Sequence, residues 1–240
     1  MAANPYIDDK GVFFNKLGIT DAKQLRSIEY GITTDRSDEI LSNKVDLGVQ
    51  GYGLGKLCAI HKHLFQDVYE WAGKPRTIQS FKRLVDFPGQ ISEFSHPRDI
   101  ASEWQQLEKE TSAFIQAQSL SFEQKQVAIT GIFIKANRIH AFPEGNGRAM
   151  QVFMKQLAHE QGIEIDYSKV NAATWNYASA VSGKFGRLFE HQHLIPAEPN
   201  PWPIKKIFSE ITSPLSQEKT VSLVPERDDD DLDRDDDWDR

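Results

Sequence analysis

The residues best suited to chemistry lie in one short stretch, His140 to Gln151, which reads His-Ala-Phe-Pro-Glu-Gly-Asn-Gly-Arg-Ala-Met-Gln. His140 carries the side chain whose proton affinity suits a general base near neutral pH. Glu144 supplies the hard oxygen that Mg²⁺ prefers, with phosphates and waters filling the other coordination positions. The spacing therefore indicates a base and a metal-binding carboxylate at one site.

The residues after Glu144 predict a phosphate-binding turn. Gly145-Asn146-Gly147 leads into an amphipathic helix pattern, and a helix start presents unpaired N–H groups and a partial positive charge. Glycines let the main chain approach an anion closely. Arg148 adds a planar fork of donors that matches phosphate oxygens.

Each of these features is more often structural when it occurs alone. A Gly-x-Gly sequence is usually a turn, a histidine after an apolar run usually packs or caps a helix, and a glutamate before glycine is often a solvated charge. Five specified residue types at fixed spacing seldom coincide, however. We therefore interpret the stretch as a functional site.

The stretch resembles the signature of the Fic family (filamentation induced by cyclic AMP), His-x-Phe-x-Asp/Glu-Gly-Asn-Gly-Arg-x-x-Arg. Matching positions are His140, Phe142, Glu144, Gly145, Asn146, Gly147 and Arg148. The last arginine of the signature is replaced by Gln151. The run from Leu64 to Gly73, followed by Arg76, is also similar to family members, in particular to the host-targeted Fic effectors of Bartonella.

This resemblance implies a protein adenylyltransferase, which moves AMP from ATP to a Ser, Thr or Tyr hydroxyl of a target protein and releases pyrophosphate. It implies that His140 accepts the hydroxyl proton and that Glu144 holds Mg²⁺. The nucleotide-binding residues that it implies are Phe142, Gly145, Asn146, Gly147, Arg148 and Gln151, with Phe142 anchoring the loop. The expected cofactors are ATP and Mg²⁺, and a host small GTPase is one candidate for the protein target.

Gln151 departs from the family at the position where the resemblance implies a clamp on the terminal phosphate. Replacing that charge with a neutral donor costs about 1.5–3 kcal/mol, the range for charged hydrogen bonds. We therefore expect a nucleotide that is bound more weakly or placed differently, and not a certain loss of activity. Two further interpretations stay open: a degenerate Fic domain that binds nucleotide or a partner but transfers little, and a Fic enzyme that uses another donor, transferring phosphate or UMP.

In the family, the last arginine also receives a glutamate from an inhibitory Ser/Thr-x-x-x-Glu helix. The nearest pattern here runs from Ser119 to Glu123 and lacks the Gly or Asn that usually follows. We therefore expect any inhibition to come from a separate small antitoxin chain.

Several helices must position this motif. Apolar residues at helical spacing predict helices over 21–32, 54–72, 97–118, 121–138, 146–161, 172–183 and 204–211. Thr20 is the expected N-cap of the first, and Ser121 with Gln124 resembles a capping box. The helix over 121–138 is apolar nearly all round, which predicts a central position, and it delivers His140 to the site.

The resemblance implies an all-α class, a Fic-like bundle of six to eight helices with one small β-hairpin flap. Tyr177, at helical spacing in the segment 172–183, is a weak candidate for a nucleotide base pocket, because such an aromatic residue is more often part of the core. His61 and His63 are two residues apart rather than four, so we interpret both as structural.

Residues 77–95 interrupt the helices. Thr77 to Phe81 alternates as a strand does, whereas Lys82-Arg83 and Pro88-Gly89 predict turns. In the Fic family this place holds the flap, a hairpin that aligns the target by adding it as a strand. The residues expected to dock the target are Thr77, Ile78, Gln79, Lys82 and Arg83. The basic pair is either a set of solvated turn charges or a dock for an acidic patch of the target.

The composition allows one domain with a substantial core: 240 residues, 39% hydrophobic. We expect a Fic domain over 1–211 and a disordered acidic tail over 212–240. The formal net charge of −7 falls within residues 226–240, where ten acids face three arginines; the remainder holds 35 − 10 = 25 acids and 28 − 3 = 25 bases. This balance offers no argument for nucleic acid or an anionic membrane as a partner.

The expected location is the bacterial cytoplasm, with secretion into host cells as an alternative. The single cysteine, Cys58, has apolar neighbours, which favours a buried thiol in a reducing compartment. No signal peptide is recognised at the start of the chain, and no apolar run is long enough to span a membrane. Export through a dedicated machine would leave no such mark.

Overall fold

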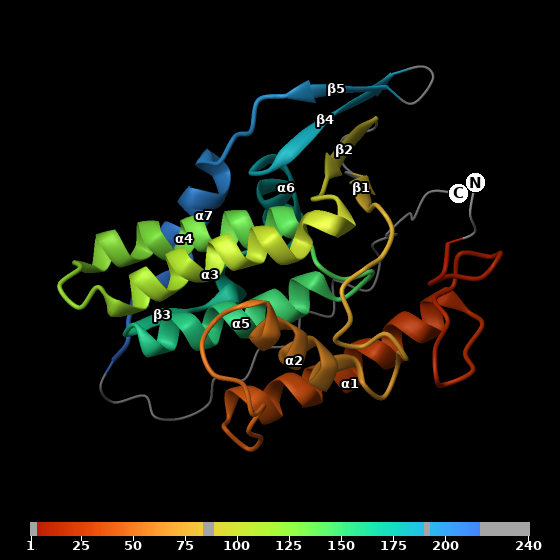
Figure 1. Cartoon of the computed structure of the whole chain (residues 1–240), viewed down its shortest axis with the longest axis horizontal. Helices are drawn as coiled ribbons and strands as arrows, with labels where there is room; N and C mark the ends of the chain where they lie inside the picture. Colours follow the sequence, from red (N-terminus) through yellow and green to blue (C-terminus); the bar gives the residue numbers. More distant parts are fainter. Residues whose placement is uncertain (1–3, 84–88, 190–192, 217–240) are drawn as a thin grey trace.

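A computed structural model describes residues 4–83, 89–189 and 193–216 (Figure 1). Its α-helices are α1 (Ala22–Leu41), α2 (Leu54–Phe65), α3 (Ile100–Gln116), α4 (Phe122–Ile139), α5 (Asn146–Glu160), α6 (Ala172–Val181) and α7 (Trp202–Ile211). Short 3₁₀ turns, η1 (Pro97–Asp99) and η2 (Tyr167–Lys169), precede α3 and α6. Helix α5 contacts α1, α2 and α4, and α4 also packs on α3. The bundle therefore surrounds the helix that begins at the predicted phosphate-binding turn.

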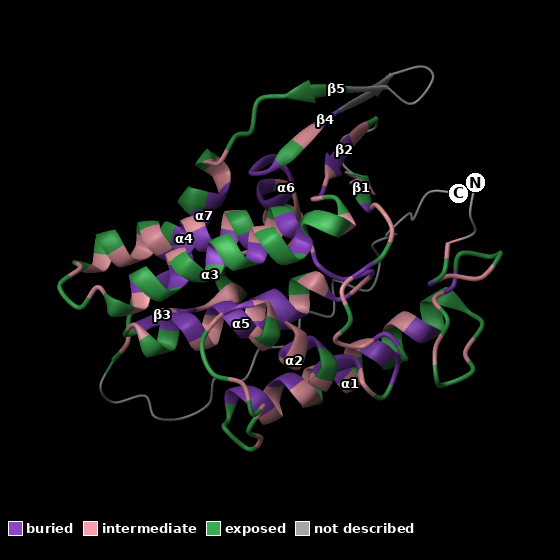
Figure 2. Cartoon of the chain, in the orientation of Figure 1, coloured by how far each residue is buried: buried purple, intermediate pink, exposed green. Residues whose placement is uncertain are grey.

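Apolar residues at helical spacing fill the space between these helices. Buried side chains of α5 include Ala149, Val152, Phe153 and Leu157; they face Leu57, Ile60, Leu64 and Phe65 of α2 and Ile129, Ile132, Phe133 and Ala136 of α4. Figure 2 shows the buried residues on the sides of the helices that face one another. Because period-3.6 burial is what packs a helix on its neighbours, the sequence pattern locates this core correctly.

The helix boundaries follow local caps. Ser121 caps α4, and Gln124 completes the capping box, as predicted. Helix α1 begins one residue later than predicted, with Asp21 rather than Thr20 as its N-cap, and it continues to Leu41. Helix α2 stops at Phe65, not at residue 72. The chain turns after it, and Gly73 adopts φ 77°, where a Cβ would collide with the Cys58 carbonyl.

The fold is mostly helical but not purely all-α, so the expected class is corrected. One antiparallel sheet has the order β1-β2-β4-β5, formed by Phe81–Arg83, Gln90–Glu93, Lys184–Phe189 and His193–Ala197. A second pairs β3 (Ile163–Ile165) with β6 (Thr212–Pro214). Strand β4 was missed because it pairs with β2, a partner far away in the sequence, and short strands carry little local signal.

The predicted flap is therefore half of a larger sheet. Its first strand is β1, so Lys82 and Arg83 lie in a strand and not in the turn that their sequence suggested. Residues 77–79 precede the strand and do not form it. Residues 84–88, which include the predicted turn residue Pro88, lie outside the described part of the chain. Figure 1 shows this sheet at the end of the bundle where α4 ends and α5 begins.

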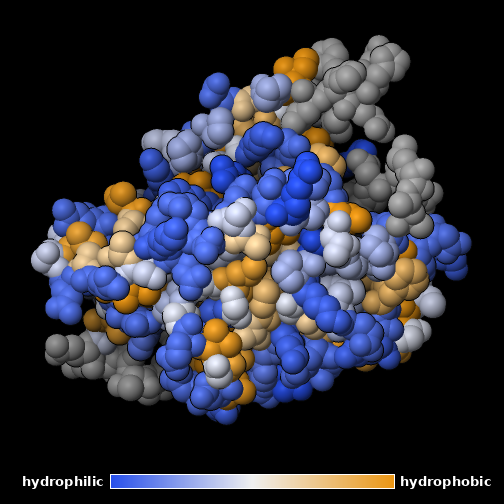
Figure 3. Space-filling view, viewed as in Figure 1, coloured by the Kyte–Doolittle hydropathy of each residue, from blue (hydrophilic) through white to orange (hydrophobic). Residues whose placement is uncertain are grey.

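Residues 212–214 belong to the folded body. They form β6, and the N–H of Leu215 donates to the carbonyl of Gly162 over 2.9 Å. The body thus extends beyond the expected boundary at 211; residues 217–240 lie outside the described part, and the disordered tail stays a prediction. Figure 3 shows one face covered mainly by hydrophilic residues with scattered apolar ones. Every helix in the described residues is too short or too polar to cross a bilayer.

Candidate active site

The predicted motif forms the turn between α4 and α5. His140 is the C-cap residue of α4 and adopts φ 49°, ψ 68°, a left-handed conformation that is uncommon for a residue with a Cβ. Gly145 is the N-cap of α5 and is also left-handed, at φ 77°. These two reversals turn the chain so that the end of one helix and the start of the next face the same space.

Packing requires a glycine at position 145, whereas a larger residue would fit at position 147. A Cβ on Gly145 would lie 2.2 Å from a ring carbon of Phe65, whereas one on Gly147 would meet nothing within 4 Å. No side chain of the described residues caps α5, so the first N–H groups of this helix have no intrahelical or capping acceptor there. The start of α5 therefore offers backbone donors and the positive end of its dipole to an anion.

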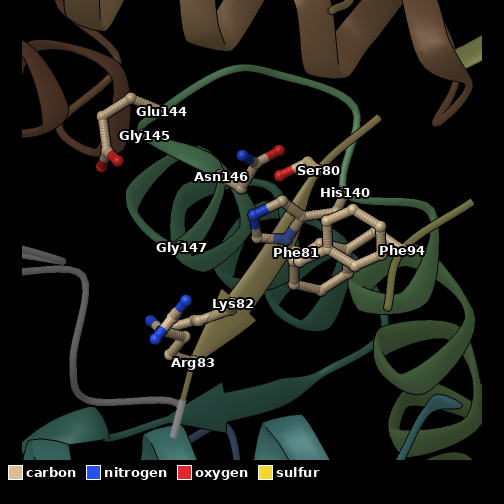
Figure 4. A pocket seen from close by; sticks show the side chains of 10 residues that line it. All are labelled: Ser80, Phe81, Lys82, Arg83, Phe94, His140, Glu144, Gly145, Asn146 and Gly147. Carbon is tan, nitrogen blue, oxygen red and sulfur yellow. The ribbon is translucent and has the colours of Figure 1, made fainter. Parts of the chain in front are cut away.

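A pocket opens at this turn (Figure 4). The space between its lining residues, counted together with the open solvent at its mouth, is about 490 Å³. The α4–α5 turn contributes His140, Glu144, Gly145, Asn146 and Gly147, and the flap contributes Ser80, Phe81, Lys82, Arg83 and Phe94. The structure thus gathers the predicted base, carboxylate and glycines with the basic pair of the flap.

The environment of His140 favours its neutral form. Its ring stacks on Phe94 with centroids 3.6 Å apart and planes inclined by 5°. Burial lowers the pKa of His140 well below its usual value, and the charges of Lys82 and Arg76 act in the same direction, against the backbone carbonyl of Asn137. Its Nδ1 has no hydrogen-bond partner among the described residues. A neutral imidazole in a pocket is competent to accept a proton.

Side chains around the loop hold its shape. The Asn146 amide both accepts from the Phe142 N–H and donates to the Phe142 carbonyl, each over 2.8 Å. Phe142 itself is fully buried and stacks on His61 at 3.8 Å, which agrees with its expected anchoring role. The Asn146 side chain is therefore occupied by the loop, so any contact of Asn146 with phosphate would come from its backbone.

His61 fixes the same loop from α2. The Gly73 N–H donates to His61 Nδ1 over 2.9 Å, so the proton must sit on Nε2, which bonds the Glu144 carbonyl at 3.0 Å. Burial lowers the pKa of His61 to about 3, which keeps the ring neutral. His61 is structural, as predicted, but it supports the site directly, a role that its sequence spacing did not reveal.

The Arg148 side chain is 23% exposed, and it is held by a carboxylate that the sequence did not single out. Its Nη2 contacts Glu29 of α1 and, at 3.3 Å, Glu144; Nη1 donates to Thr33 over 3.2 Å. Burial disfavours its charge, but Glu29 and Glu144 outweigh that effect and raise the pKa of Arg148. The Tyr69 hydroxyl donates to Glu29 as well. A single acid on an amphipathic helix carries no distinguishing sequence signal, which is why Glu29 was missed.

Other predicted site residues lie outside the described pocket lining: Thr77, Ile78, Gln79, Phe142, Arg148, Gln151 and Tyr177. Thr77 instead bonds Tyr6 of the N-terminal segment, whose hydroxyl accepts the Thr77 N–H over 2.8 Å. Tyr177 and Gln151 are half-buried on α6 and α5. Their nucleotide contacts stay predictions.

The donor set suits Mg²⁺ bound together with phosphate. No group of three or more His, Cys, Asp or Glu side chains in the described residues could hold a metal on its own. Glu144 lines the pocket, and its side chain is 20% exposed. Because Mg²⁺ is commonly bound through one or two carboxylates with phosphates and waters, a single accessible carboxylate fits this ion.

Comparisons with known proteins identify relatives of this chain. The sequence model of the Fic/DOC family matches residues 53–158. The chain is 35% identical over 187 residues to the protein adenylyltransferase VbhT of Bartonella schoenbuchensis, covering 75% of this chain and 36% of that protein. It is 30% identical over 186 residues to the probable protein adenylyltransferase Fic of Salmonella typhimurium, covering 77% and 86%. The chain thus spans about a third of VbhT but most of the Salmonella protein.

Solved structures share the fold. BepC, a VirB-translocated effector of Bartonella tribocorum crystallised with AMPPNP, has a TM-score of 0.71 at 23% identity, with 88% of this chain and 97% of that chain covered. The N-terminal Fic domain of a Bep effector from Bartonella quintana, with bound ADP, has a TM-score of 0.70 at 24% identity, covering 87% and 94%. Sequence and fold agree, and this chain belongs to the Fic/DOC family.

Proposed function

We propose that this protein is an adenylyltransferase that transfers AMP from ATP to a Ser, Thr or Tyr hydroxyl of a target protein. The observation that carries the proposal is the neutral imidazole of His140 in the same pocket as the unpaired N–H groups of the α5 start. A base and an anion site in one pocket suit an attack by a hydroxyl on a phosphate. The names of the relatives at 35% and 30% identity support the same reaction.

The residues would divide the work as follows. His140 accepts the proton of the target hydroxyl as its oxygen bonds to the α-phosphorus, and the bond from that phosphorus to the α,β-bridging oxygen breaks, so that pyrophosphate leaves. Backbone N–H groups from Gly145 to Gly147 bind phosphate oxygens, and Arg148 stabilises charge on the leaving group. Catalysis of this kind depends on positioning and on preorganised electrostatics.

Glu144 would hold Mg²⁺ together with the phosphates. The ion supplies charge neutralisation of the phosphate oxygens when bound. Glu144 is positioned for this from two sides, by the Arg148 contact at 3.3 Å and by the His61 bond to its carbonyl.

The flap would present the target. Strand β1 is an edge of its sheet within the described residues, so its outer side can accept another strand. A host small GTPase is the proposed target class, and a separate small antitoxin chain is the proposed regulator. Export into host cells belongs to the same proposal.

A charge-reversal experiment tests the docking role of Lys82 and Arg83. If Lys82 and Arg83 dock the target, the double variant Lys82→Glu, Arg83→Glu should label the target less and bind AMPPNP with unchanged affinity. Lys184→Glu is the matched control, because Lys184 is exposed on the same sheet and pairs with Glu93 over 2.8 Å. Unchanged labelling would remove the docking role, and lost AMPPNP binding would assign the pair to phosphate instead.

A nucleotide-binding module with little transfer is the second candidate. Gln151 lacks the family's charge, and Arg148 is already engaged by Glu29. Gln151→Arg should tighten AMPPNP binding by about tenfold or more, since a charged hydrogen bond contributes roughly 1.5–3 kcal/mol. Calorimetry on both proteins measures this; equal affinities would show that position 151 does not meet the phosphates.

The decisive test of the proposed function is transfer of label from α-labelled ATP with Mg²⁺ in host-cell lysate. The unaltered protein should label a protein band, and His140→Ala should not, while both bind AMPPNP in calorimetry. Labelling that persists in His140→Ala would remove His140 as the base. Nucleotide binding without any labelling would favour the second candidate or another donor, to be tried with γ-labelled ATP and UTP.

A further inference from the structure

Arg76 lies in the segment that joins α2 to the flap, and its guanidinium is buried, with the residue 2% exposed. No carboxylate contacts it among the described residues. Its donors all reach backbone carbonyls instead: Nε that of His140 over 2.8 Å, Nη1 that of Ile78 over 2.8 Å, and Nη2 those of Ser95 and, at 3.3 Å, Ile139. A buried charge must be hydrogen-bonded to be tolerated, and here only main-chain carbonyls bind it. Arg76 is therefore placed to hold the main chain in its conformation.

These carbonyls come from two parts of the site. Ile139 and His140 end α4, where carbonyls lack intrahelical donors and the dipole favours a cation. Ile78 precedes β1 and Ser95 follows β2, so they are the two ends of the flap. One planar guanidinium therefore joins the backbone of the proposed base to both ends of the hairpin beside it.

Other contacts run along the same connection. The Arg76 N–H donates to the Ala141 carbonyl over 2.8 Å, directly after His140. Phe94, which precedes Ser95, stacks on the His140 ring, as Figure 4 shows. The Ser95 N–H donates to the Arg138 carbonyl over 3.1 Å. The flap base and the end of α4 are thus held together on several sides of the imidazole.

The conformation of His140 needs such support. A non-glycine residue in the left-handed region costs about 1–3 kcal/mol and persists only where its surroundings determine it. The hydrogen bond from Arg76 Nε to the His140 carbonyl acts on the peptide plane that follows this residue. Lysine could not replace the arginine, because an ammonium is a single centre and cannot bond carbonyls on several sides in one plane.

We propose that Arg76 is a positioning residue that fixes the orientation of His140 relative to the flap. This inference rests on the proposed function, in which the flap presents a hydroxyl to His140. Loss of the guanidinium would let the flap and the imidazole move independently. The nucleotide site would remain, since the start of α5 is held separately by Asn146 and His61.

The test compares Arg76→Lys with the control Arg138→Lys. Arg138 lies in the last turn of α4, and its side chain is half exposed and pairs with Glu103. In Arg76→Lys we expect a shifted NMR titration of His140, and hydrogen exchange at the Phe94 and Ser95 amides at least tenfold faster. AMPPNP affinity should stay within twofold, and the control should match the unaltered protein. An unchanged His140 titration with unchanged flap exchange in folded Arg76→Lys would overturn the proposal.

A second measurement needs no variant at Arg76, in case that variant fails to fold. In the unaltered chain, the Arg76, Phe94, Ser95 and His140 amides all donate to described carbonyls. The proposal predicts that they exchange at a common rate, as one opening unit. Flap amides that exchange tenfold faster than those of Arg76 and His140 would overturn it. Neither measurement depends on AMP transfer, so the role of Arg76 can be tested even if the proposed function is wrong.

Discussion

At the scale of single residues, the site depends on histidines that burial keeps neutral. His140 is neutral and faces the pocket, whereas His61 is neutral and bonded on both ring nitrogens. The same residue type thus serves as proposed base in one place and as loop support in another. The difference is set by whether the ring nitrogens are already occupied.

Burial of neutral His61 predicts a pH-dependent stability. Its folded pKa of about 3 lies below the ordinary value of 6.5, so below pH 6.5 the unfolded state binds a proton that the folded state does not. This contribution to the free energy of unfolding is complete above pH 6.5 and is lost as the pH falls from 6.5 toward 3, by at most about 1.4 kcal/mol per pH unit.

Urea unfolding between pH 7.5 and 4.5 measures this slope. His61→Phe keeps an aromatic ring stacked on Phe142 but has no group that titrates in this range. It should reduce the pH dependence of the free energy of unfolding by the amount due to about one proton, although it lowers stability at every pH. His159→Gln, at an exposed position, is the control and should keep the full slope. Equal slopes in all three proteins would contradict the prediction.

Glu29 predicts a second effect at the residue scale. Glu29→Gln removes the buried partner of the Arg148 charge, so we expect a loss of about 3 kcal/mol in the free energy of unfolding, as for a broken buried ion pair. Glu110→Gln removes a partly exposed partner of Lys135 and should cost under about 1 kcal/mol. Chemical denaturation measures both; similar losses would mean that Glu29 does not sustain the Arg148 charge.

At the scale of elements, the α4–α5 turn combines two left-handed residues with an uncapped helix start. Phe65 of α2 leaves room for a glycine and nothing larger at position 145. The helix start is then directed at the pocket rather than at a neighbouring side chain. Local backbone conformation and packing by a distant helix are both needed.

Two glycine substitutions distinguish packing against Phe65 from close approach of the backbone to the nucleotide. Gly145→Ala places a Cβ against the Phe65 ring in a left-handed residue, so we expect lost stability and lost AMPPNP binding. Gly147→Ala meets no atoms within 4 Å and lies in a helix, so stability should hold while the nucleotide is kept at a greater distance. Thermal unfolding and calorimetry report on both; a Gly147→Ala variant that binds AMPPNP normally would place the phosphate elsewhere.

At the scale of the whole molecule, the body is closed by an element near the end of its described part. Strand β6 pairs with β3, and the Thr212 hydroxyl accepts from Gln126 of α4 over 2.7 Å. These contacts tie residues after α7 back to α4 and to the segment after α5. The folded unit therefore includes residues 212–215.

Two truncations test this boundary. A chain that ends after Ile211 loses the β6 ladder, and at a net 0.5–1.5 kcal/mol per hydrogen bond we expect a loss of roughly 2–4 kcal/mol. A chain that ends after Ser216 should keep its stability within about 0.5 kcal/mol and its labelling activity. Denaturant unfolding of both distinguishes them; equal stability would return the boundary to 211.

The sequence by itself determined the helices that build the bundle and the stretch that carries the chemistry. Period-3.6 apolar patterns and a capping box are local signals, so α4, α5 and α7 were found close to their observed bounds. The motif from His140 to Arg148 was equally readable, because its members are neighbours in the chain. The end of α2 was not predicted, because the apolar pattern continues to residue 72 whereas the helix ends at Phe65.

Only the tertiary structure decided which distant residues serve that motif. Glu29, His61 and Arg76 lie 64 or more positions before the loop residues that they contact. The pairing of β2 with β4 joins segments that are equally remote. The physical reason is that a buried charge or a short strand is stabilised by a partner that is distant in the sequence. Local sequence patterns do not identify that partner, so only the folded structure reveals it.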